Sequence, residues 1–69
     1  MATIYVALLN EGVDVWRPVE ASHLGDDTYR IDGTIPAEEE WQFTPGTKVR
    51  CESKAFGSGE AGIVAVAVA

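Results

Sequence analysis

The segment Gly57-Ser58-Gly59-Glu60-Ala61-Gly62 has the G-x-G-x-x-G spacing of dinucleotide-binding turns, in which glycines let the backbone approach a pyrophosphate. That chemistry requires a strand before the glycines, a helix directly after them and an acid about 20 residues further on. Only seven residues follow Gly62, and all of them are Ile, Val or Ala with no helix start. The sequence therefore predicts a flexible hairpin connection here, and we expect neither a nucleotide nor another cofactor.

Cys51 and His23 are the only cysteine and the only histidine, so they are the only pair that could supply a nucleophilic thiol and its base. They lie in different segments, and Cys51 is on the inward side of an alternating run, where cysteine is usually a small buried apolar residue. One Cys and one His cannot form a disulfide or the four-ligand set of a structural zinc site. We expect no catalytic residue and no metal site, and we interpret His23 as an exposed loop residue.

Acidic residues gather in segments with turn character, at Asp26-Asp27 and at Glu38-Glu39-Glu40. General acid and base catalysis needs two carboxyl groups whose surroundings move their pKa values apart. A calcium loop spaces its ligands alternately around a central glycine, and neither segment has that pattern. We interpret both segments as solvated turns.

Three arginines, Arg17, Arg30 and Arg50, lie inside segments with strand character. If their strands are neighbours, the guanidinium groups form a patch for an anionic ligand or an acidic partner, with Trp16 or Trp41 as a stacking surface. The candidate binding residues are thus Trp16, Arg17, Arg30, Trp41 and Arg50.

The alternative for the arginines is a set of surface ion pairs. Asp32 lies two residues after Arg30, and Glu52 lies two residues after Arg50, so each acid shares a strand face with its arginine. Pairs of this kind contribute roughly 0.2 to 1 kcal/mol. Both interpretations stay open from the sequence, and ion pairing is the favoured one.

The aromatic residues Trp16, Tyr29 and Trp41 recur about a dozen residues apart, and this spacing is typical of short strands joined by turns. They and Phe43 form either a core or an aromatic groove of the kind that small barrels use for peptides. We expect most of them in the core, including Tyr29. Trp16, beside Arg17-Pro18, is the one we expect to be partly exposed.

Short β-favouring segments with few connecting residues must position these groups. We expect five to six strands in an antiparallel meander, with strict alternation in residues 28–32 and 48–52. The first and last segments are apolar on both faces, so they either pair with each other or lie in a subunit interface. The extended segments are residues 3–9, 13–21, 28–32, 41–43, 48–52 and 63–69.

Turn residues separate these segments. Asn10-Glu11-Gly12 ends the first, Gly25-Asp26-Asp27 is a turn, and Pro45-Gly46 has the order of a type II turn. Pro18 removes a ladder donor, so we expect a bend and a register shift near Arg17-Pro18. Pro36 ahead of three acids could begin one helical turn.

Composition limits the class of protein. A chain of 69 residues is one domain, and its net charge of −6 disfavours nucleic acid and anionic membrane surfaces. The longest apolar run is far short of the roughly 20 residues of a membrane helix. No secretory signal opens the chain, so we expect a cytoplasmic protein that could gain stability as a homo-oligomer.

Three strings carry a resemblance: residues 11–21 (EGVDVWRPVEA), 29–33 (YRIDG) and 41–52 (WQFTPGTKVRCE). With them the chain resembles a family of small bacterial proteins of uncharacterised function that are similar to SH3-like β-barrels in outline. The resemblance implies a small SH3-like antiparallel barrel spanning residues 1–69, and it implies no active-site residue. From the aromatic and arginine residues, and not from the resemblance, we expect a non-enzymatic protein or peptide interaction module. The alternative is a small ligand-binding or enzymatic barrel whose site is assembled by oligomerisation.

Overall fold

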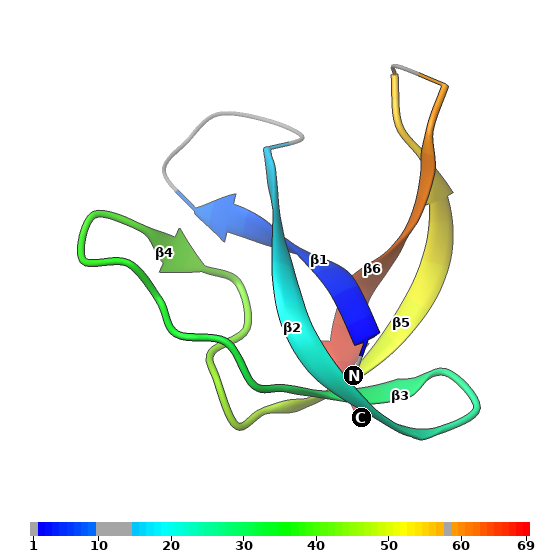
Figure 1. Ribbon diagram of the computed structural model, residues 1–69, viewed down its shortest axis with the longest axis horizontal. Helices are drawn as coiled ribbons and strands as arrows, with labels where there is room; N and C mark the ends of the chain where they lie inside the picture. The colour runs from blue at the N-terminus through cyan, green and yellow to red at the C-terminus, as the bar shows by residue number, and fades with distance from the viewer. Residues whose placement is uncertain (1, 10–14, 58) are drawn as a thin grey trace.

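The computed structural model describes residues 2–9, 15–57 and 59–69. The predicted end of the first segment at residues 10–12, the start of the second at Val13-Asp14, and Ser58 lie outside these described residues. Figure 1 shows an all-β arrangement within them. The strands are β1 (Ala2–Leu9), β2 (Trp16–Gly25), β3 (Thr28–Ile31), β4 (Glu40–Trp41), β5 (Lys48–Ala55) and β6 (Ala61–Val68).

The strands form one sheet in the order β2-β3-β5-β6-β1-β4, with an additional pairing of β2 to β1. The pairings therefore run in a circuit, β1–β2–β3–β5–β6–β1, and β4 adds to the end of β1. The predicted pairing of the first and last strands is confirmed. The expectation of purely antiparallel pairing is wrong for that pair, because Tyr5 of β1 and Val64 of β6 meet in parallel. Directions alternate along the circuit, so its first and fifth strands must run the same way.

The core lies inside this circuit, and period-two alternation selects its residues. Tyr29 and Ile31 of β3 are buried while Arg30 is exposed, which confirms the alternation expected for that strand. Val49 and Cys51 of β5 are buried in the same way. The buried cluster comprises Ile4, Val6, Val19, Ala21, Tyr29, Ile31, Trp41, Val49, Cys51 and Ala65.

The register shift expected near Arg17-Pro18 is wrong. The β1–β2 ladder runs without interruption from Ala2 opposite Ala21 to Ala7 opposite Trp16, with Pro18 inside it. The ladder tolerates this proline because β3 pairs with β2 only from Ala21 onward, so Pro18 lies where β2 has a single strand neighbour. The irregularity in β2 lies instead between His23 and Gly25.

Two connections follow their sequence signals. The amide of Thr47 donates to the carbonyl of Thr44 at 3.1 Å, and Gly46 has φ 89°, so Pro45-Gly46 forms the predicted type II turn. At Pro36 the carbonyl accepts from the amide of Glu39 at 3.1 Å, which makes a single turn. The described residues contain no helix, and therefore none that could cross a membrane.

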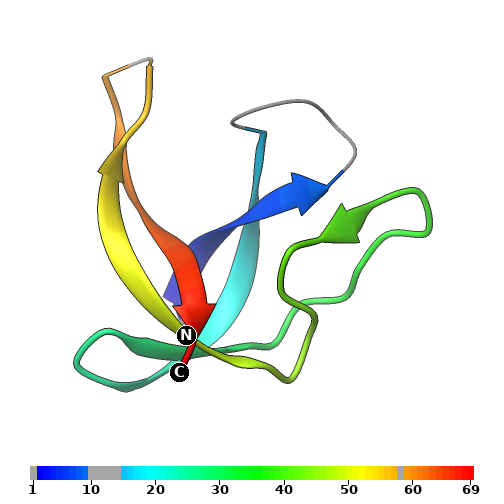
Figure 2. The same ribbon diagram turned by 180° about the vertical axis from the view of Figure 1, so that it is seen from behind.

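Two other elements differ from expectation. β4 is shorter than residues 41–43, because only Glu40 and Trp41 pair with the end of β1 before the chain bends. The β5–β6 hairpin is longer than the predicted segments 48–52 and 63–69, because β5 continues to Ala55 and β6 begins at Ala61. The hairpin points away from the end of the molecule where β1 begins and β6 ends (Figures 1 and 2). This projecting hairpin carries residues of the two surfaces described below, an aromatic cluster that includes Phe56 and a cavity beside Cys51.

Candidate functional site

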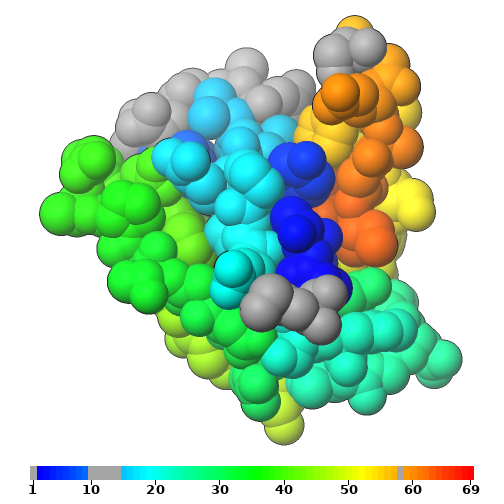
Figure 3. Space-filling model, in the orientation of Figure 1, coloured from blue at the N-terminus to red at the C-terminus, as the bar shows by residue number. Residues whose placement is uncertain are grey.

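Three aromatic side chains meet on the outer face of the sheet, opposite to the core. We call Tyr5, Trp16 and Phe56 the outer aromatic cluster. The rings of Tyr5 and Phe56 lie 5.0 Å apart at 57°, and those of Trp16 and Phe56 lie 6.4 Å apart, edge to face. Each side chain is half-buried. The cluster brings together β1, β2 and the end of β5, and Figure 3 shows β1 between β2 and the β5–β6 hairpin.

Alternation explains why these rings face outward. Ile4 and Val6 point into the core, so Tyr5 between them points out, and Trp16 lies opposite Ala7 on the same outer side. Gly62 provides the space, since a Cβ there would lie 2.7 Å from Cε1 of Tyr5 and 2.8 Å from Cε2 of Phe56. The cluster thus depends on a glycine for close packing of two rings on the backbone of β6.

A cation and an indole N–H complete the cluster. Nζ of Lys54 lies 5.8 Å from the centroid of the Trp16 ring, a cation–π distance. Nε1 of Trp16 is buried and has no hydrogen-bond partner among the described residues. Trp16 was expected to be partly exposed, and its half-buried position agrees with that expectation.

Arg17 and Trp41 meet at one carboxylate. Nε of Arg17 donates to Oε1 of Glu39 at 3.1 Å, its Nη2 donates to Oε2, and Nε1 of Trp41 donates to Oε1 at 3.0 Å. The hydrogen bonds from Arg17 and then from Trp41 lower the pKa of Glu39. Trp41 is only 5% exposed and belongs to the core cluster. This arrangement fastens the connection between β3 and β4 to β2.

Arg30 and Arg50 lie together on the outer face of β3 and β5. Arg30 is directly opposite Lys48, and Arg50 is opposite Thr28. Arg17 instead lies opposite Val6 in the β1–β2 ladder. The structure therefore brings two of the three arginines onto one face and leaves the third elsewhere.

The ion pairs predicted for these two arginines are confirmed. Nε of Arg30 donates to Oδ1 of Asp32 at 2.9 Å, and Nη1 of Arg50 donates to Oε2 of Glu52 at 2.7 Å. Ser22 joins the first pair, with its hydroxyl donating to Oδ2 of Asp32 at 2.5 Å and accepting from Nη2 of Arg30 at 3.2 Å. The hydrogen bonds from Ser22 and then Arg30 lower the pKa of Asp32.

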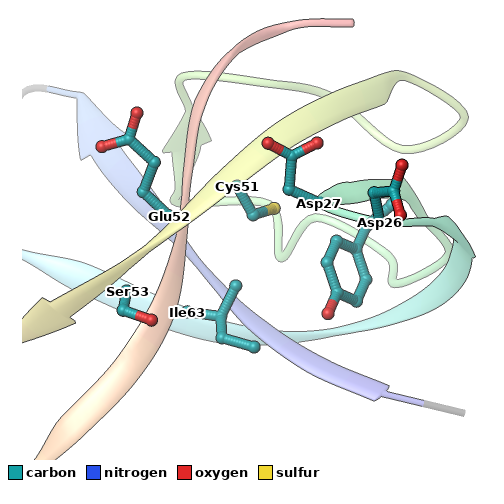
Figure 4. Close-up of a pocket in the computed structure, with 7 residues that line it drawn as sticks. Asp26, Asp27, Cys51, Glu52, Ser53 and Ile63 are labelled. Carbon is teal, nitrogen blue, oxygen red and sulfur yellow. The ribbon is translucent and has the colours of Figure 1, made fainter.

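A small cavity of about 150 Å³ opens beside Cys51. In Figure 4 the Asp26-Asp27 turn and the Cys51 thiol lie at one side of it, and Ser53 and Ile63 lie at the other. Cys51 is 3% exposed, which confirms its prediction as a small buried residue. Burial, and then the charge of Asp27, raise the pKa of its thiol to about 11, so the thiol stays protonated at neutral pH.

His23 does not reach this thiol through any hydrogen bond in the described part of the chain. Its ring stacks on Tyr29 with centroids 4.6 Å apart, and Nε2 lies 2.6 Å from the carbonyl oxygen of Asp26. His23 is exposed as expected, but the loop assignment is wrong because the residue belongs to β2.

Two further features are the glycine-rich segment and the possible metal ligands. The glycine-rich segment connects β5 to β6, with Gly59 at φ 90° and Gly62 already inside β6, which confirms the hairpin interpretation. Among residues 2–9, 15–57 and 59–69, no group of three or more His, Cys, Asp or Glu could hold a metal ion.

Sequence reasoning missed Tyr5, Phe56 and Glu39. Tyr5 was recognisable as the one aromatic residue of its strand, and Phe56 as an isolated ring at a glycine-rich turn. Glu39 carried no signal, because its partner Arg17 lies 22 residues away.

Comparison with protein-family models, with curated proteins and with solved structures finds no match. The resemblance to small bacterial SH3-like proteins therefore stays a prediction.

Proposed function

We propose that this protein is a non-enzymatic interaction module that binds a protein or peptide partner through the outer aromatic cluster. The observation that carries the proposal is Trp16, a half-buried indole outside the core whose Nε1 has no partner within the described residues. A buried indole N–H normally finds an acceptor, and this one can gain a peptide carbonyl if the ring turns its N–H outward when the partner binds.

The composition of the cluster supports this use. Tyr and Trp provide large contact areas with few rotatable bonds, and they are enriched among the residues that dominate binding energies. Lys54 lies over Trp16 and adds a charged edge to the aromatic surface. Aromatic grooves on small barrels bind extended peptides in this way.

The proposed architecture is an SH3-like barrel in a cytoplasmic protein. The circuit of strand pairings and its short connections support the barrel. The net charge of −6 argues against nucleic acid as the partner. Arg30 and Arg50 stay candidate contacts on a separate face, where each uses part of its guanidinium for an ion pair. Arg17 and Trp41 have structural partners that account for them.

The second candidate, an enzymatic or ligand-binding barrel assembled by oligomerisation, receives no support from the cavity beside Cys51. The raised pKa of that thiol opposes its use as a nucleophile. Sedimentation of a strict monomer at high concentration would count against this candidate.

A random dodecapeptide library displayed on phage tests the proposal. Peptides selected on the wild-type protein should bind the Trp16→Ala variant at least about 30-fold more weakly, as expected for a residue that dominates an interface. Lys48→Ala, on a different face, is the matched control and should bind with unchanged affinity. Failure to select any peptide, or equal affinity for the Trp16→Ala variant with an intact fold by circular dichroism, would overturn the proposal.

A further inference from the structure

One edge of β5 extends beyond its neighbour. β3 pairs with β5 from Arg30 opposite Lys48 to Thr28 opposite Arg50, and the amide of Cys51 makes the last contact, donating to the carbonyl of Asp27 at 2.7 Å. β5 continues to Ala55, and no described strand pairs with this edge after Cys51. The opposite edge of β5 is paired with β6 from Val49 to Ala55.

The backbone groups along this open edge point away from β6. Amide groups of successive strand residues alternate between the two sides of a strand. Because the amide of Cys51 points toward β3, the N–H and C=O groups of Ser53 and Ala55 point the same way, into the space that β3 leaves. They form a row of ladder groups that no strand of the described residues pairs with, and such edges readily accept another chain.

The cavity beside Cys51 lies at the start of this open edge. Its apolar part is the ring of Tyr29, the protonated thiol of Cys51 and Ile63. Asp26 and Asp27 lie at its margin (Figure 4). Both are exposed, and neither forms an ion pair with a described residue. Its volume of about 150 Å³ is below the roughly 300 to 1,000 Å³ of small-molecule sites, so it suits one inserted side chain.

We infer that β5 binds an extended segment of a partner protein by strand addition, and that a lysine or arginine of this segment occupies the cavity. The long apolar stem of such a side chain matches Tyr29, Cys51 and Ile63, and its charged head reaches the carboxylates of Asp26 and Asp27. Backbone pairing with Ser53 and Ala55 gives the segment its register. The net charge of −6 attracts a basic segment from a distance.

This surface is separate from the outer aromatic cluster. It uses the inner, cavity-facing side and the β3-facing edge of β5, whereas Tyr5, Trp16 and Phe56 lie on the outer face. A substitution in one surface should therefore leave binding at the other unchanged.

The probe is a pool of random octapeptides with lysine held at a central position, and matched pools hold norleucine or glutamate there. The lysine pool should bind the full chain at least about tenfold more tightly than either matched pool, because only lysine pairs with a carboxylate. Amide hydrogen exchange by NMR should show new protection at Ser53 and Ala55.

Two variants locate the contacts. Asp27→Asn keeps the backbone carbonyl that Cys51 uses and removes the charge, so affinity for the lysine pool should fall about tenfold. Ser53→Pro removes an N–H that points away from β6, so strand addition should be lost while the β5–β6 ladder stays. Glu38→Gln, in a different exposed turn, is the matched control, and Trp16→Ala should bind this pool normally.

Several outcomes would overturn the inference. Equal binding of the lysine and norleucine pools would show that the cavity does not hold a basic side chain. Unchanged amide exchange at Ser53 and Ala55 would show that no strand is added to this edge of β5. Protection of these amides in the protein alone, rising with its concentration, would identify a second copy as the occupant. Binding of single-stranded DNA of random sequence at the same amides would identify a nucleic acid instead.

Discussion

The guanidinium of Arg17 on β2 donates two hydrogen bonds to the carboxylate of Glu39, which lies 22 residues later in the connection between β3 and β4. Trp41 donates to the same carboxylate from the core. One acidic side chain, with 10% of its surface exposed, thus joins a strand, a connection and a buried ring. This accounts structurally for two residues that the sequence offered as binding positions.

Replacing Glu39 by Gln should destabilise the protein, because Arg17 loses its charged partner and the two-point geometry is broken. The urea midpoint should fall while the m-value is unchanged, since the same surface is exposed on unfolding. Glu38→Gln, one residue earlier and exposed, should leave the midpoint close to that of the wild type. An unchanged midpoint for Glu39→Gln would contradict the fastening role.

Stability should depend on acid pH through Glu39 and Asp32. Hydrogen bonds lower their folded-state pKa values below the ordinary 4.5 and 3.8, so their contribution is present above these values and is lost as pH falls through the folded pKa values. Urea unfolding should give a steady free energy near neutral pH and a decline below about pH 4.5. The double variant Glu39→Gln and Asp32→Asn should flatten that decline, and an equally steep decline would refute the assignment.

Gly62→Ala should disrupt the outer aromatic cluster. The added Cβ would lie 2.7 Å from the ring of Tyr5 and 2.8 Å from that of Phe56, so both rings must move. Overpacking of this kind costs about 1 to 3 kcal/mol of unfolding free energy. Gly57→Ala is the control in the same hairpin, because no described residue beyond its chain neighbours has an atom within 4 Å of the added Cβ, and it should change stability little. Equal stability of the two variants would argue against close packing on β6.

Cys51 should resist alkylation in the folded protein. Its thiol is buried and its pKa is raised to about 11, so at pH 8 roughly one molecule in a thousand carries the reactive thiolate. Iodoacetamide should label Cys51 slowly in buffer and rapidly in concentrated urea, as followed by mass spectrometry. Fast labelling under native conditions would show that the cavity exposes the sulfur.

Local patterns in the sequence determined most of the strands and turns, although β2, β4 and β5 differ from their predicted bounds. Alternation in residues 28–32 and 48–52 assigned Tyr29, Ile31, Val49 and Cys51 to the core, because the strand period of two acts within a few residues. Pro45-Gly46 formed its turn for the same reason, since φ preferences belong to single residues. The pairs Arg30–Asp32 and Arg50–Glu52 were also readable, as each spans two residues on one strand face.

Only the tertiary structure decided what meets across the circuit of strands. The parallel contact of Tyr5 with Val64, the approach of Phe56 to Tyr5, and the open edge of β5 all depend on how strands distant in the chain align. Register and closure are set by packing of the whole core, so no window of sequence contains them. Trp16, Arg17, Trp41 and Cys51 are candidates in the sequence, but their grouping came from the fold. The fold places Trp16 in an aromatic surface, Arg17 and Trp41 on Glu39, and Cys51 in a cavity beside an edge that no described strand pairs with.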